Sequence, residues 1–125
     1  MNPDDAVSLH DAVSLHDTPT AEQLVESVRE WLERDVLTGT TGRLQFHSRV
    51  AINVLAMVER ELRLGAGQAA AHADRLAQLG CADDTELAAR IREGELDDRL
   101  EEVRALVLAD VRDKLAVANP KYLAD

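Results

Sequence analysis

The chain has 125 residues, 46% of them hydrophobic, which is enough to build the core of one domain. Its net charge of −10 excludes nucleic acid and anionic membranes as favoured partners, because both are bound through clustered Lys and Arg. A single cysteine, Cys81, excludes an internal disulfide, and the sequence has neither a secretory signal nor an apolar run of roughly 18 residues that could span a membrane. These features predict a cytoplasmic protein.

Residues 1–18 are predicted to form a weakly structured tail, followed by a single helical domain over residues 19–125. The tail contains a tandem duplication, DAVSLH, at Asp5–His10 and Asp11–His16. A six-residue unit that occurs twice matches no solenoid period, so duplication within a tolerant terminus is the simpler interpretation.

The first predicted helix covers about residues 21–37. Thr20 and Gln23 have the spacing of a capping box at its start. Apolar residues then recur at helical intervals and form one stripe, made of Leu24, Val25, Val28, Trp31, Leu32 and Val36. Asp35 interrupts this stripe.

The second predicted helix covers about residues 43–64 and is apolar over a wide arc, which is typical of a central helix with several neighbours. Two shorter helices follow, over about residues 68–79 and 84–93, the latter introduced by Asp83 and Glu86 as a capping pair. The last helix covers about residues 97–118 and ends at Asn119-Pro120.

Glycine and proline positions set these boundaries. No proline lies between Pro19 and Pro120, and the six glycines are predicted to mark helix breaks: Gly39, Gly42, Gly65, Gly67, Gly80 and Gly94. Few aromatic residues and many Ala and Leu favour an aliphatic helical core. We therefore predict an all-α bundle of about five helices, with the two long helices adjacent at its centre.

Polar residues interrupt the apolar faces of both long helices. They are Arg43, His47, Asn53 and Glu61 in the second helix, and Asp110 and Lys114 in the last. Buried charges are costly unless they are paired, so two interpretations remain open. Either the residues form a structural network, in which Lys114 pairs with Asp110 or Glu61, or they line an interface that a partner completes.

Sequence motifs give no sign of catalysis. The chain has no phosphate-binding glycine loop, no H-E-x-x-H and no G-x-S-x-G motif. Cys81 is interpreted as a small buried or loop thiol, and His10 and His16 as incidental to metal binding. No catalytic residue, metal or cofactor is predicted.

Two stretches go beyond a generic helical pattern. They are GRLQFHSRVAINVLAMVERE at Gly42–Glu61 and DKLAVANPKYL at Asp113–Leu123. Together they resemble an uncharacterised bacterial family, a domain of unknown function, over about residues 19–124. Its small helical members are encoded beside aminoglycoside-phosphotransferase-like kinases and acyl-CoA dehydrogenases.

The resemblance implies a non-catalytic accessory subunit. Its expected partner is the aminoglycoside-phosphotransferase-like kinase, which acts on a hydroxyacyl-CoA in acid catabolism. The motif residues are then candidates for contacting the partner or its ligand: Arg43, His47, Arg49, Asn53, Lys114, Asn119, Lys121 and Tyr122. Two alternatives stay open, a stand-alone homodimeric helical bundle and a small acyl-CoA-binding module.

Overall fold

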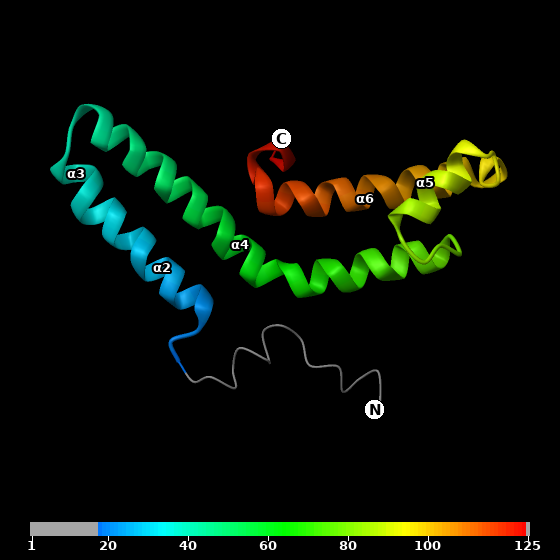
Figure 1. Cartoon of the computed structure of the whole chain (residues 1–125), viewed down its shortest axis with the longest axis horizontal. Coiled ribbons are helices and arrows are strands. Elements are labelled where there is room, and N and C mark those ends of the chain that lie inside the picture. The colour runs from blue at the N-terminus through cyan, green and yellow to red at the C-terminus, as the bar shows by residue number, and fades with distance from the viewer. Residues whose placement is uncertain (1–17, 125) are drawn as a thin grey trace. The chain divides into compact units, whose positions relative to one another are not determined.

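A computed structural model describes residues 18–124, and the DAVSLH duplication and its two histidines lie outside them. The described residues contain helices and no strand, which confirms the predicted all-α class. The elements, shown in Figure 1, are α2 (Ala21–Trp31), the π-helix η2 (Leu32–Val36), α3 (Leu37–Gly39), α4 (Gly42–Gln78), α5 (Asp84–Arg92), the 3-10 helix η3 (Asp97–Arg99), α6 (Leu100–Ala118) and the 3-10 helix η4 (Pro120–Leu123).

The chain divides into two compact units, and the boundary falls inside α4 between Ala66 and Gly67. Unit 1 contains α2, η2, α3 and the first part of α4. Unit 2 contains the rest of α4, α5, α6 and η4. The assignment of one domain to residues 19–125 stays a prediction.

The start of α2 follows the predicted capping box. The Gln23 amide donates to Thr20 Oγ1 at 3.2 Å, and the Thr20 amide donates to Gln23 Oε1 at 2.8 Å. The helical path then continues through η2 into α3, close to the predicted end at Leu37. The π-helical turn was not predicted. It interrupts the α-helical periodicity that placed Leu32 and Val36 on the same apolar stripe as Leu24.

Hydroxyl and amide side chains satisfy the carbonyls where this helical path ends. Thr38 Oγ1 donates to the Arg34 carbonyl, Thr40 Oγ1 donates to the Val36 carbonyl at 2.6 Å, and Gln45 Nε2 donates to the Leu37 carbonyl at 3.2 Å. Val36 and Leu37 are among the last four residues of this helical path, so the bonds from Thr40 and Gln45 stabilise the reversal into α4.

Ion pairs join α2 to the first part of α4 in unit 1, where the two helices run side by side in opposite directions (Figure 1). Arg29 holds Glu59 through Nε and through Nη2, the latter at 3.2 Å from Oε1. Arg63 pairs with Glu22 at 3.6 Å. Glu59 is only 8% exposed, and the hydrogen bonds from Arg29 compensate for its desolvation.

The predicted helix break at Gly65 and Gly67 is wrong, because α4 is continuous from Gly42 to Gln78. Glycine inside a helix costs about 1 kcal/mol relative to alanine and does not forbid the helix. The flanking leucines and alanines are strong helix formers and outweigh that cost. The predicted second and third helices are therefore one helix, and the described residues contain fewer helices than the five expected.

Gly80 ends α4 as predicted, with a positive φ of 71°. The Gly80 amide donates to the Ala77 carbonyl at 3.0 Å and the Cys81 amide to the Leu76 carbonyl at 2.9 Å, the two bonds of a Schellman motif. Two arginines cap the remaining carbonyls. Arg90 Nη1 donates to the Gly80 carbonyl at 2.9 Å, and Arg99 Nη2 donates to the Gln78 carbonyl at 2.9 Å.

The predicted capping pair of α5 is confirmed. The Glu86 amide donates to Asp83 Oδ1 at 2.8 Å, and Glu86 Oε2 accepts from the Ala82 amide at 2.8 Å. Gly94 closes the helix with a φ of 78°, again in a Schellman motif.

The hydrophobic core of the described residues lies in unit 2. It consists of Leu76, Leu79, Cys81, Leu87, Leu96 and Val103, with Leu106 packed against it. The end of α4, α5, the first turns of α6 and the segments that connect these helices supply this cluster. Cys81 is therefore the small buried thiol that was predicted. Between residues 18 and 124, no helix is both long and apolar enough to cross a membrane.

Candidate functional site

The eight predicted contact residues divide between the two units. Arg43, His47, Arg49 and Asn53 lie in exposed positions of α4 in unit 1. Arg43 Nε lies 3.5 Å from His47 Nε2, and the His47 ring meets the edge of the Phe46 ring with 5.5 Å between centroids. These contacts are local, because the residues are neighbours on one helix.

The other four candidates lie in unit 2. Lys114 is exposed on α6, Asn119 is the half-buried C-cap of that helix, and Lys121 and Tyr122 are exposed on η4. The Asn119 carbonyl accepts from the Tyr122 amide at 3.1 Å, which sets the turn into η4. The turn places Tyr122 on the surface.

The expected enclosure of Asn53 and Lys114 is wrong, because both side chains are exposed. On α4, the buried Ser48 and Glu59 mark the side that faces α2. Asn53 follows Ser48 by five positions, which places it about 140° around the helix. Lys114 forms no ion pair with Asp110, which is bound by His72 and Arg75 instead.

A polar cluster in unit 2 replaces the expected network. His72 Nδ1 lies 2.9 Å from Asp110 Oδ2, and His72 Nε2 lies 3.1 Å from Asp84 Oδ1. Arg75 Nη1 donates to Asp110 Oδ1 at 2.7 Å and to Asp113 Oδ2 at 2.8 Å. The cluster joins the second part of α4 to α6 and to the first residue of α5.

The electrostatics of this cluster favour a charged histidine. The hydrogen bond from His72 to Asp110 raises the pKa of the imidazole above its usual value, against a smaller effect of burial. Burial alone would raise the pKa of Asp110, but the hydrogen bonds from Arg75 and His72 together lower it. Both carboxylates around His72 therefore stabilise the imidazolium, as expected for a structural ion-pair network.

Asp110 interrupts the apolar face of the last helix as predicted, but its partners are His72 and Arg75 and not Lys114. His72 and Arg75 lie in an alanine-rich stretch that appeared to carry no site. The available signal was their spacing, because His72 and Arg75 are three residues apart, as are Asp110 and Asp113. Residues three positions apart lie on the same side of a helix. Each pair therefore presents its two side chains together, and a basic pair on one helix can bind an acidic pair on the other.

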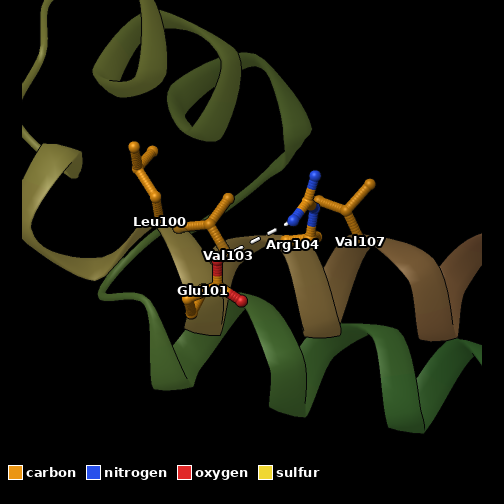
Figure 2. Close-up of a pocket in the computed structure, with 5 residues that line it drawn as sticks. All are labelled: Leu100, Glu101, Val103, Arg104 and Val107. Carbon is orange, nitrogen blue, oxygen red and sulfur yellow. Dashed lines mark ion pairs between the residues drawn. The ribbon is translucent and has the colours of Figure 1, made fainter.

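A shallow groove lies along α6 (Figure 2). It has a volume of about 450 Å³ and is lined by Leu100, Glu101, Val103, Arg104 and Val107. Leu100, Val103 and Val107 project on the same side of the helix, whereas Arg104 and Glu101 form an exposed ion pair at 3.7 Å. The groove offers apolar contact with one cation beside it. Within the described residues, no group of His, Cys, Asp and Glu side chains is arranged to hold a metal ion.

Two apolar surfaces are exposed in unit 1. The first, the α2 stripe, consists of Leu24, Val28 and Trp31, each about half exposed. The second, the α4 stripe, consists of Phe46, Val50, Val54 and Met57, which are 40–61% exposed. In each stripe the residues recur at intervals of three or four, so they share one side of their helix. Exposed apolar side chains grouped in this way are typical of interaction surfaces.

Comparison with known families identifies the chain. A family model described as a domain of unknown function, DUF6285, matches residues 38–122. The match includes the motif stretch on α4 and all but the last residue of the stretch over α6 and η4, whereas α2 precedes it. It indicates no enzyme class. Neither the curated proteins nor the solved structures contain a match to the chain. Because the family model spans more than half of its length, this chain belongs to the DUF6285 family of domains of unknown function.

Proposed function

We propose that this chain is a non-catalytic accessory subunit that binds and supports an aminoglycoside-phosphotransferase-like kinase. The kinase acts on a hydroxyacyl-CoA in acid catabolism, as the family resemblance implies. The proposal has a structural part, the surface that docks on the kinase, and a biochemical part, the effect of docking on turnover.

The observation that carries the proposal is the α2 stripe. Leu24, Val28 and Trp31 lie one helical turn apart and are each about half exposed. Trp31 is the only tryptophan of the chain, and tryptophan is strongly enriched among the residues that dominate binding energy at protein interfaces. A protein groove that accepts this row would use the helix-in-groove mode of recognition.

Charge supports the same type of partner. The chain carries a net charge of −10, and α2 bears Glu22 and Glu26 on the side opposite its apolar stripe. A groove in a basic surface would attract this acidic chain during the encounter. We therefore assign the docking surface to α2 and expect its binding to weaken as salt concentration rises.

The basic residues outside α2 are candidates for contacting the kinase's substrate. Arg49 in unit 1 and Lys121 in unit 2 are both exposed, and Arg is suited to bidentate phosphate contacts. If they act this way, Arg49→Ala and Lys121→Ala raise the KM for the acyl substrate in the reconstituted pair. Unchanged KM and kcat in both variants would remove this role.

The docking test is co-expression of the chain with the adjacent kinase, followed by size exclusion and an ATP-consumption assay. We expect the two proteins to co-elute and the kinase to turn over faster in the complex. Trp31→Ser should abolish co-elution, because a central anchor typically contributes at least about 2 kcal/mol.

Leu108→Ser is the matched control, because Leu108 is equally exposed but lies on α6. It should leave co-elution unchanged. Co-elution that survives Trp31→Ser would place the docking surface elsewhere. A kinase that never associates with the wild-type chain would refute the accessory role.

An acyl-CoA-binding module is a second candidate, favoured by the groove of Figure 2. Leu100, Val103 and Val107 would contact an acyl chain, and Arg104 would approach an anionic group. Calorimetry of the isolated chain with a medium-chain acyl-CoA tests this function. Binding that is lost in Val107→Asp would support it, and the absence of heat at high protein concentration would exclude it.

A further inference from the structure

The α4 stripe is bounded by opposite charges. Arg43 precedes Phe46 by three positions, and Glu61 follows Met57 by four, so both charges lie on the same side of the helix as the apolar residues. Both side chains are exposed. Neither forms an ion pair with any residue that the structure describes, whereas Glu22, Arg29, Glu59 and Arg63 of the same unit are paired.

The order of residues along this stripe is self-complementary. A two-fold axis beside Ile52 that reverses the helix places Arg43 of one copy opposite Glu61 of the other, and Val50 opposite Val54. Phe46 then comes beside Met57 of the second copy. A two-fold interface has to be complementary to itself in this way, because the same surface is used on both sides.

We infer that the α4 stripe is the interface of a homodimer, in which α4 packs antiparallel against α4 of a second copy of this chain. Burial of Phe46, Val50, Val54 and Met57 would provide the hydrophobic contribution. The two ends would each carry one Arg43–Glu61 pair, which fixes the register and the antiparallel direction.

The size of the contact predicts a reversible dimer. The stretch from Arg43 to Glu61 is about 27 Å long, at about 1.5 Å per residue, and a helix with its side chains is about 10 Å wide. Such a contact belongs to the small end of specific interfaces, so we expect dissociation in the micromolar range or above. The kinase-docking residues lie on α2, and the two proposals can therefore fail separately.

A charge exchange tests the pairing. Sedimentation equilibrium of the full chain, from about 10 to 500 μM, should show the mass rising from 13.7 kDa toward twice that value. Arg43→Glu alone and Glu61→Arg alone should each weaken the dimer at least tenfold, because each brings like charges together at both ends. An equimolar mixture of the two variants should dimerise again, since one copy of each restores both pairs.

Arg49→Glu is the matched control, because it makes the same charge change on the same helix but outside the stripe. It should leave the dissociation constant within about threefold, and far-UV circular dichroism should be unchanged in all variants because every altered side chain is exposed. A wild-type chain that remains monomeric at 500 μM would overturn the inference. So would a mixture that fails to recover dimer formation.

Discussion

The ion pair between Arg29 and Glu59 should determine the stability of unit 1. Arg29→Met removes both hydrogen bonds to a carboxylate that is only 8% exposed, and it leaves that charge buried without its partner. Breaking a buried pair from one side costs about 3–5 kcal/mol, and we expect about 3 because the Arg29 side chain is still 22% exposed. Glu59 also raises the pKa of Arg29, as expected for this close pairing.

Urea unfolding at pH 7, followed by tryptophan fluorescence, measures this loss. Trp31 is the only tryptophan and lies on α2, so its signal reports directly on the helix that the pair holds. The double variant Arg29→Met/Glu59→Met should recover most of the loss, because a well-packed apolar pair often replaces a buried ion pair without cost.

Arg34→Met is the control for removing an arginine from the same helical path. Arg34 pairs with Glu30 at 2.7 Å, but its side chain is 72% exposed, so we expect a change within about 0.5 kcal/mol. Equal losses in Arg29→Met and Arg34→Met would refute the reasoning, because burial would then have no influence on the value of the pair.

Two further predictions concern unit 2 and α4. The pKa of His72 is raised in the folded state, so its contribution to stability should be complete below the ordinary histidine pKa of about 6.5 and be lost as pH rises through the folded value. Urea unfolding between pH 5.5 and 9 should show wild type losing stability relative to His72→Gln, and parallel curves would contradict this. Gly65→Ala and Gly67→Ala should each stabilise α4 by about 0.5–1 kcal/mol, because both positions are helical and the added methyl group meets open space. Gly80→Ala should destabilise by about 1 kcal/mol, because its φ is positive, and chemical denaturation that ranks the three variants otherwise would contradict the assignment.

Local sequence signals predicted the helix ends well. The capping box at Thr20, the N-cap at Asp83 and the terminating glycines at Gly80 and Gly94 all lie where the sequence placed them. These features depend on hydrogen bonds between residues three to five positions apart, and such bonds form wherever those residues meet in the chain. The same rule failed at Gly65, where strong helix formers on both sides outweigh one glycine.

The candidate site was less predictable, because burial depends on which side of a helix meets a neighbour. Asn53 and Lys114 interrupt apolar patterns and were expected inside, yet the sides they occupy are exposed. The partners of Asp110 are His72 and Arg75, more than thirty residues away and in a stretch without any motif. No local pattern encodes such a contact.

The helical class, the caps and the aliphatic character of the core can be read from the amino-acid sequence, because they follow from short-range propensity and periodicity. The family resemblance can be read from it too, but it rests on the two motif stretches at Gly42–Glu61 and Asp113–Leu123. Three features depend on tertiary packing: the burial of Glu59 against Arg29, the gathering of the core around Leu79, and the exposure of the α2 and α4 stripes. The reason is that an apolar stripe specifies that a helix has a side to cover, whereas the packing of distant segments decides what covers it.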